Sequence, residues 1–435
     1  MPPPLWALAA MFVAVCAMGS GGIWFALLGD TPPMLRVSWR LFITAILQLP
    51  FFLRERFYGA KIDDRPFEPL NAVFFARWRA HLGIIILSGT FLAIHFCAWS
   101  WSINFTSLAH SLLFVSTSPL FMVAFAALRH LASQIAIKYG VINLSRNSLV
   151  IETNEQFSTI SIEETKQQEE TKQQENDINV ENSSTIITTS FSSLVSYFSR
   201  ALSSERSLPP TYLEVLGTVL SFIATAVLII SASETSSKSR NVGSTGLSDE
   251  PMITVEGDLV ALLGGFAVWI YIEVGGNLRS WMPLFHYAFP VTLTSSIASF
   301  LFSLILEGKS LSLVGFGANS PLGFLGDWGR FQIVFGAAFF SGMLGHTIAN
   351  LALSHLSPLL VSVSFLWEPL IGSFLGYLVG VQGVPGVATL VAGPLLMIGA
   401  FLCTIGGRDS GIDPIKVIKD LRVWCSRQEQ RVLLT

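Results

Sequence analysis

Charged residues are scarce in this sequence. Asp, Glu, Lys and Arg make up only 13% of the 435 residues, and hydrophobic residues make up 51%, whereas about a quarter of an ordinary soluble domain is charged. The net charge of -3 gives no basic excess that would favour a nucleic-acid partner. The composition therefore argues against a soluble protein and predicts a chain that folds in a lipid bilayer.

Cysteines and enzyme motifs are also few. The four cysteines are scattered, at Cys16, Cys97, Cys403 and Cys425, without the paired spacing typical of a zinc site or a disulfide framework. The sequence has no phosphate-binding loop and no nucleophile elbow between a strand and a helix. We therefore expect no enzyme activity, no cofactor and no metal site, and we name no catalytic residue.

The sequence contains many long apolar runs. About 18 apolar residues in a row are enough to cross a bilayer as a helix, and ten such runs occur. They cover residues 5–28, 33–53, 82–104, 107–128, 212–232, 257–277, 284–306, 332–353, 357–380 and 385–406. We predict an all-α membrane protein with ten transmembrane helices. The first run lacks the basic flank and cleavage site of a secretory signal, so we expect it to be retained.

Lys and Arg are unequally divided between the two sides of these ten spans. The side that holds both termini carries twenty basic residues and the other side carries four. Without the 129–211 loop, which is long enough to escape the rule, the ratio is thirteen to four. Basic residues concentrate on the cytoplasmic side, so we expect a multi-pass protein with both termini in the cytoplasm. No terminal signal selects between the plasma membrane and an internal membrane.

The chain divides into five segments on this topology. Residues 1–128 hold the first four helices, and 129–211 form a cytoplasmic loop with a low-complexity insert that we expect to be disordered. Residues 212–232 are the fifth helix, 257–406 hold the last five, and 407–435 form a cytoplasmic amphipathic tail. The insert is acidic and the tail is basic, so both are candidate binding regions for cytosolic partners.

The chain also contains a weak internal repeat. A shift of 250 residues superposes the spans without a gap. The aligned pairs are Pro33 with Pro283, Arg36 with His286, Ser107 with Ser357, and Pro119 with Pro369. Each half then holds five spans, and an odd number means that the second half enters the membrane from the opposite side. Two inverted five-helix repeats are typical of carriers that work by alternating access.

Two related stretches carry a resemblance to a known family. They run from Ser107-Leu108-Ala109 through Ser116-Thr117-Ser118-Pro119-Leu120, and from Ser357-Pro358-Leu359 through Trp367-Glu368-Pro369-Leu370-Ile371-Gly372. The chain resembles drug/metabolite transporters of the EamA type, which have ten helices in two five-helix repeats. The resemblance covers the ten spans and implies solute transport through a central cavity. Members often carry a Gly-Glu pair where this chain has Leu128-Arg129 and Gly380-Val381-Gln382.

Glu368 lies near the middle of the ninth predicted span. A charged side chain at that depth costs roughly 2.5–3.5 kcal/mol. Protonation, pairing with Arg or a hydrated substrate cavity would offset this cost. The alternative is a neutral acid that is hydrogen-bonded between helices.

Pro369 removes a backbone donor and frees the carbonyl of Phe365, and Pro119 frees that of Val115. Interrupted helices at corresponding positions point to a binding site, with simple kinks as the alternative.

Two arginines lie inside the second predicted span. Arg36 and Arg40 are four residues apart and share one helix face. Their guanidinium groups are suited to a carboxylate or phosphate on a solute. Alternatively, one of them could pair with Glu368 or Glu273, and Arg36 could reach the membrane interface. Trp39 is a candidate for the cavity wall, with packing or interface anchoring as the alternative.

Further polar residues occur within the spans: His95, His110, His346 and Asn350. His346 and Asn350 are four apart and predict a polar stripe on one helix face. Each of these residues is a candidate for substrate binding or coupling, and hydrogen bonding between helices is the equal alternative. The set lacks the acids that a metal site would add.

We therefore expect a carrier that moves a small organic solute, anionic or zwitterionic, across a lipid bilayer. Glu368 is the candidate coupling or binding acid and Arg40 the candidate anion anchor; a homodimer is compatible with this expectation. The alternative is a membrane receptor or scaffold that recruits cytosolic partners through its acidic insert and basic tail. A channel is disfavoured, because no ring of like charges marks a filter.

Overall fold

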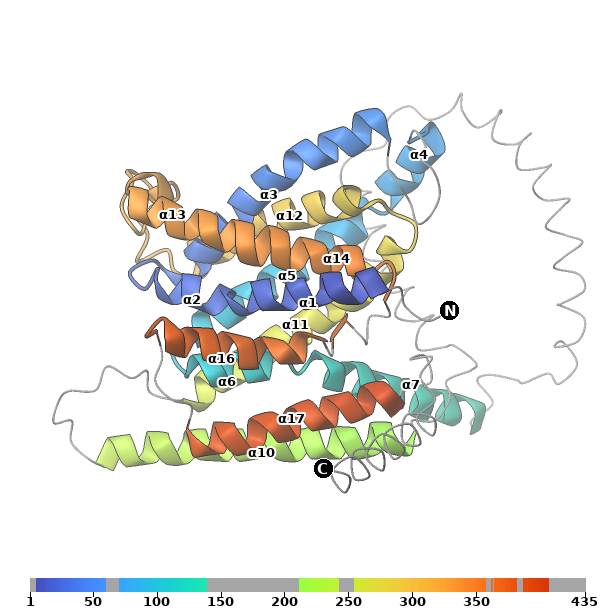
Figure 1. The fold of residues 1–435 in the computed structure, drawn as a ribbon, viewed down its shortest axis with the longest axis vertical. Coiled ribbons are helices and arrows are strands. Elements are labelled where there is room, and N and C mark those ends of the chain that lie inside the picture. Colours follow the sequence, from blue (N-terminus) through green and yellow to red (C-terminus); the bar gives the residue numbers. More distant parts are fainter. Residues whose placement is uncertain are drawn as a thin grey trace, which may run out of the picture. The chain divides into compact units, whose positions relative to one another are not determined.

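The computed structural model describes residues 5–59, 70–138, 211–241, 254–356, 361–362, 364–381 and 386–406. All regular secondary structure in these ranges is helical (Figure 1). The chain forms two compact units, Met1–Phe125 with Pro210–Thr435, and Ala126–Pro209. Of the second unit, the described ranges contain only the end of one helix, residues 126–138, and all other described residues belong to the first unit.

The first part of the chain contains eight described helices. They are α1 (Leu5–Gly19), α2 (Gly21–Ala26), α3 (Pro33–Tyr58), α4 (Ala72–Ala80), α5 (Leu82–Ser102), α6 (Leu108–Val115), α7 (Ser118–Lys138) and α10 (Tyr212–Asn241).

The second part contains more irregular helices. They are α11 (Val255–Arg279), α12 (Leu284–Leu306), the 3-10 turn η1 (Gly323–Leu325), α13 (Trp328–Gly336), the π-helix η2 (Ala337–Thr347), α14 (Ile348–Ala352), the 3-10 turn η3 (Phe365–Trp367), α16 (Glu368–Leu378) and α17 (Val387–Gly406).

Six helical segments in the described part of the chain are long and apolar enough to cross a membrane. They are Leu5–Ala26, Pro33–Tyr58, Leu82–Ser102, Val255–Arg279, Leu284–Leu306 and Trp328–Ala352. Each coincides with one of the predicted spans. Large apolar side chains such as Phe12, Phe42 and Leu301 are exposed on these helices, as lipid-facing side chains would be. The all-α class is therefore confirmed for the described residues, and the helices are those of a membrane-embedded protein.

Several predicted boundaries are wrong. Helix α7 continues to Lys138 although the loop was expected from residue 129, α10 continues to Asn241 instead of ending at 232, and α3 continues to Tyr58 instead of 53. Charged residues end an apolar run, but several of them are good helix formers. The helix therefore extends beyond the last residue of the apolar run. Helix α4 was missed inside the predicted loop 54–81. Residues 139–210, most of the insert, and the tail 407–435 lie outside the described residues.

Helices α3 and α12 pack side by side (Figure 1), and each places a glutamate at the N-terminus of the other. Glu307 accepts hydrogen bonds from the backbone N–H groups of Met34 (2.8 Å) and Leu35 (3.3 Å). Glu55 accepts from those of Phe285 (3.1 Å) and His286 (3.0 Å). The first N–H groups of a helix have no partner within the helix, so these carboxylates satisfy them. The two helices are therefore antiparallel.

Irregular helical geometry occurs close to both Pro119 and Pro369. Helix α6 ends at Val115 before α7 begins, and η3 precedes α16. The two breaks are adjacent, because the Ser118 and Ser362 hydroxyls are 2.6 Å apart. The Phe365 carbonyl was expected to lack its helical donor. It instead accepts from the Glu368 N–H and, at 3.5 Å, from the Ser116 hydroxyl, since a buried carbonyl without a donor is unfavourable.

Candidate functional site

A buried polar stripe runs along α3. Arg36, Arg40, Thr44 and Gln48 are four residues apart and at most 2% exposed, so consecutive members are neighbours on the helix surface. Thr44 donates to the carbonyl of Arg40 at 2.8 Å, and the Gln48 amide donates to the Thr347 hydroxyl at 2.9 Å. Thr44 and Gln48 were missed, although their spacing continues that of the two arginines in the sequence.

Arg36 is held by acceptors on two neighbouring elements. Its Nε donates to Ser100 Oγ at 2.8 Å and its terminal nitrogens donate to the carbonyls of Ser100 (2.7 Å) and Phe25 (2.9 Å). One of them also reaches Asn104 Oδ1 at 3.3 Å. The alternative that Arg36 extends to the membrane interface is wrong, because its side chain is 1% exposed. Every nitrogen is used, so Arg36 joins α2, α3 and α5.

Arg40 is equally buried but lacks such acceptors. None of its three guanidinium nitrogens has a hydrogen-bond partner among the described residues. Its guanidinium lies 4.3 Å from the ring centre of Phe96 and 5.6 Å from that of Phe25, distances at which cation–π attraction acts. The buried indole N–H of Trp99, which packs against Phe25, also has no acceptor among these residues. Buried donors without partners are rare and unfavourable.

Three other predicted residues lie close to Arg40. Glu368 on α16 is near enough to interact with it electrostatically, although no Arg40–Glu368 ion pair within 4 Å exists in the described structure. His95 and His346 both pack against Phe96, the ring that the Arg40 guanidinium also contacts. His95 Nδ1 contacts the Gly264 carbonyl at 3.0 Å and therefore carries the hydrogen, and the His346 ring meets Phe96 edge-on at 4.8 Å. We call Arg40, Glu368, His95 and His346 the central cluster.

Two predicted site residues lie elsewhere. Trp39 packs against Phe324 and donates its indole N–H to the Pro321 carbonyl at 2.8 Å; it belongs to a separate apolar core and does not line the central cluster. Asn350 exchanges hydrogen bonds with the Tyr271 hydroxyl, which joins α14 to α11. His346 lies in the π-helix η2 that precedes α14.

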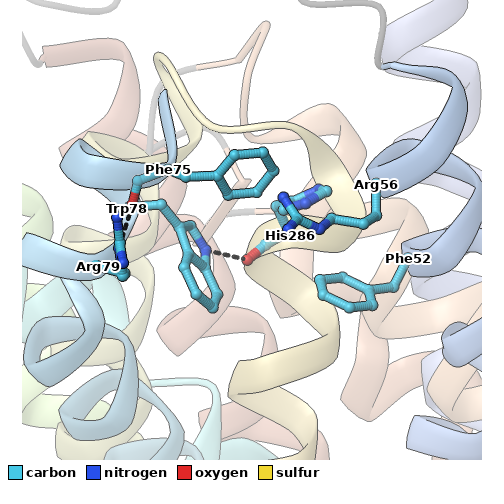
Figure 2. A pocket seen from close by; sticks show the side chains of 6 residues that line it. All are labelled: Phe52, Arg56, Phe75, Trp78, Arg79 and His286. Carbon is cyan, nitrogen blue, oxygen red and sulfur yellow. Dashed lines mark hydrogen bonds between the residues drawn. The ribbon is translucent and has the colours of Figure 1, made fainter. Parts of the chain in front are cut away.

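The C-terminal end of α3 contributes to a pocket of about 330 Å³. Figure 2 shows the side chains that line it, from α3, α4 and the start of α12. They are Phe52, Arg56, Phe75, Trp78, Arg79 and His286. None of these residues was predicted as a site residue, because α4 was not recognised and the pocket forms only when three segments meet.

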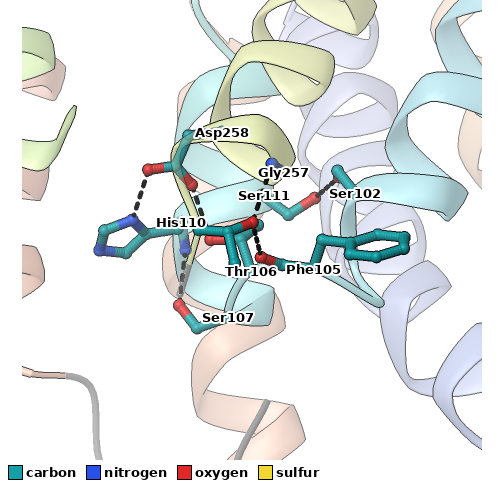
Figure 3. Close-up of polar contacts among 9 residues, drawn as sticks. Ser102, Phe105, Thr106, Ser107, His110, Ser111, Gly257 and Asp258 are labelled. Carbon is teal, nitrogen blue, oxygen red and sulfur yellow. Dashed lines mark hydrogen bonds and ion pairs between the residues drawn. The ribbon is translucent and has the colours of Figure 1, made fainter. Parts of the chain in front are cut away.

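His110 has a buried acidic partner that was not predicted. Figure 3 shows Asp258, at the start of α11, between His110 and Thr106. Its carboxylate accepts from the Thr106 hydroxyl at 2.6 Å and lies 3.2 Å from His110 Nδ1. Both His110 and Asp258 are at most 1% exposed. Since the contacts satisfy the carboxylate and join α6 to α11, the geometry favours the structural alternative for His110.

Comparison with known proteins adds little. No model of a known protein family matches the sequence, and no curated protein matches it at a significant level. One solved structure, described only as a crystal structure of a protein, superposes with a TM-score of 0.45 and 15% identity over 93% of this chain and 98% of its own.

Proposed function

We propose that the protein is a carrier that moves a small organic solute across a membrane by alternating access. It would be a transporter of the EamA type, with ten membrane helices in two inverted halves and both termini in the cytoplasm. The observation that carries the proposal is Arg40, a guanidinium that is 1% exposed and has no acceptor among the described residues. A charge buried in this way requires a partner, and a solute with an anionic group supplies one.

The way the helices pair supports two inverted halves. Helices in the same position of each half pack on each other: α3 on α12, α6 on α16 and α10 on α17. Other contacts exchange, since α5 packs on α11 while η2 and α14 pack on α1. This pattern is unchanged when the halves are exchanged, as a pseudo-twofold axis in the membrane plane requires. The reciprocal glutamate caps of α3 and α12 fit the same axis.

The chemistry of the central cluster supports an anionic or zwitterionic solute. Arg40 offers a planar fork of donors that matches a carboxylate or phosphate in a bidentate manner. Glu368 is partly buried, and no described residue donates a hydrogen bond to its carboxylate. It is therefore positioned either to accept from a cationic group of the solute or to carry a coupled proton. The rings of Phe25 and Phe96 close the cluster with apolar surface.

The interrupted helices support alternating access. The breaks between α6 and α7 and between η3 and α16 lie side by side, and α16 begins with Glu368 itself. A carrier must rearrange around its binding site, and broken helices near the midplane place movable segments there. The acid of the central cluster would then move with the second half and its arginine with the first.

A solute screen by thermal shift on detergent-purified protein tests the proposal. The compounds would be amino acids, nucleotide sugars, phosphorylated metabolites and organic cations, because a ligand of the folded state raises the melting temperature by mass action. We expect an anionic or zwitterionic compound to stabilise the protein and to show saturable flux in proteoliposomes.

Variants identify the site. Arg40→Met should abolish both the thermal shift and the flux, Glu368→Gln should reduce the flux, and Lys309→Met, which removes an exposed cation, should change neither. A solute that stabilises the Arg40→Met variant as well as the original protein would remove the central cluster from the proposal. No stabilising compound in folded protein would favour a receptor or scaffold.

The receptor or scaffold alternative depends on the insert and the tail, which lie mostly outside the described residues. Deleting residues 150–205 separates the two functions. A carrier should keep its flux after the deletion, whereas a scaffold should lose its cytosolic partners.

A further inference from the structure

The pocket in Figure 2 combines basic and aromatic side chains. Arg56 lies above the ring of Phe75, with its guanidinium 3.7 Å from the ring centre. Arg79 Nε is 3.4 Å from the Phe75 carbonyl. Both arginines are exposed, and no described residue accepts a hydrogen bond from Arg56. The pocket therefore presents two guanidinium groups whose donors are largely free.

The inner wall of the pocket is His286, which is held firmly. Its Nδ1 contacts the Glu55 carboxylate at 2.9 Å, its carbonyl accepts from the Trp78 indole at 3.0 Å, and its ring packs on Phe52 at 4.8 Å. Glu55 is already committed to the N-terminus of α12 and to this ring. No described carboxylate lies within ion-pair distance of Arg56 or Arg79.

The second nitrogen of His286 has no partner. Nε2 is buried, and no described residue forms a hydrogen bond with it. The whole residue is only 1% exposed. A buried ring nitrogen on a pocket wall calls for a polar partner.

We propose that this pocket binds a phosphate group, that of an anionic phospholipid headgroup at the membrane interface. Two guanidinium groups on the wall of one small pocket suit a phosphate group, whose oxygens accept charge-assisted hydrogen bonds. The site is separate from the central cluster, and the lipid would be a bound component rather than the carried solute.

The surroundings of the pocket indicate a lipid rather than a soluble phosphate. Phe57 and Tyr58, at the end of α3, are 75% and 80% exposed, and Val73 on α4 is 69% exposed. Exposed aromatic and apolar residues beside arginines are typical of the membrane interface, and basic pockets between membrane helices bind lipid headgroups. On the proposed topology this pocket faces the cytoplasmic leaflet, where anionic lipids concentrate.

Native mass spectrometry of the detergent-purified full chain, titrated with phosphatidic acid and with phosphatidylcholine, tests this site. We expect phosphatidic acid to bind at least about tenfold more tightly, and Arg56→Gln with Arg79→Gln to reduce its affinity by about tenfold, the effect of losing charge-assisted hydrogen bonds. Arg54→Gln with Lys309→Gln removes two exposed charges outside the pocket and should leave the affinity unchanged. Because all four side chains are exposed, each variant should fold.

The lipid titration has three possible outcomes. Equal losses in both double variants would overturn the site, because general charge attraction would then explain binding. Competition by glycerol 3-phosphate at the concentration of the lipid would overturn the headgroup assignment in favour of a soluble phosphate. Loss in the pocket variant alone, without such competition, supports the proposal. Lipid binding is measured without a solute, so it succeeds or fails independently of the transport assay.

Discussion

Arg36 and Arg40 lie one turn apart on α3, and each is 1% exposed, yet their surroundings differ. Arg36 donates to Ser100, Phe25 and Asn104, whereas none of the described residues accepts a hydrogen bond from Arg40, which contacts the ring of Phe96. A buried charge with all its partners is expensive to remove, because the partners are then left unpaired. A buried charge without partners itself lowers the stability of the folded protein.

This contrast predicts opposite effects on stability. Arg36→Met should lower the stability of the folded protein by about 3 kcal/mol, because buried acceptors at Phe25 and Ser100 lose their donors. Arg40→Met should leave it unchanged or raise it by about 1 kcal/mol, because no acceptor loses a donor and a charge leaves the interior. The melting temperatures of the two variants in detergent, without solute, measure this.

A decrease of similar size in both variants would contradict the interpretation of Arg40. It would mean that Arg40 has a structural partner in the folded protein, and the case for a solute site at the central cluster would weaken. A stability gain that accompanies loss of solute binding is the usual sign of a residue kept for function.

At the scale of elements, α11 closely approaches the junction between α6 and α7. Gly265 on α11 faces this junction: a Cβ added there would lie 2.7 Å from Thr117 Oγ1 and 2.8 Å from the Phe114 carbonyl oxygen. Small residues allow membrane helices to pack this closely. Because the neighbouring atoms include backbone, they cannot move away cheaply.

Gly265→Ala should therefore lower stability by about 2 kcal/mol, the usual cost of overpacking. Gly386→Ala is the matched control, since a Cβ there would meet no atom within 4 Å. Thermal unfolding of both variants, followed by helical circular dichroism, gives the comparison. Equal melting temperatures for the two variants would show that α11 does not pack tightly against the junction between α6 and α7.

The glutamate caps give a second prediction for elements. Glu307→Ala removes the acceptor of the Met34 and Leu35 N–H groups and should destabilise the protein by about 1 kcal/mol, the typical value of a helix cap. Asp30→Ala removes an exposed acid near the same helix end and should have no measurable effect. Equal melting temperatures for the two variants would show that the cap contributes nothing.

At the scale of the whole molecule, the proposed topology places the end of α3 and the connection after α12 on opposite sides of the membrane. Single cysteines at Arg54→Cys and Lys309→Cys, both exposed positions, test this in a background without the four native cysteines. In sealed cells, a membrane-impermeant maleimide should label Lys309→Cys directly and Arg54→Cys only after permeabilisation. Labelling of both from outside would refute the inverted arrangement.

The sequence by itself determined the class of protein and the location of most helices. Six apolar runs coincide with helices long enough to cross a membrane, because the period and length of a hydrophobic run are properties of local sequence. The same holds for the irregular helical geometry close to Pro119 and Pro369, since proline acts on its own helix. Helix ends were predicted less well where charged residues extend a helix past its apolar run, as at α7 and α10.

Only the tertiary structure decided which polar residues meet. Arg36 and Arg40 are equivalent by spacing, and a buried environment with acceptors for one and none for the other arises from helices distant in the chain. Trp39 was a candidate for the cavity, but a loop near residue 321 holds it elsewhere. The pairing of Asp258 with His110 and the basic pocket around His286 join segments that no local pattern connects, because side-chain partnership depends on packing in three dimensions.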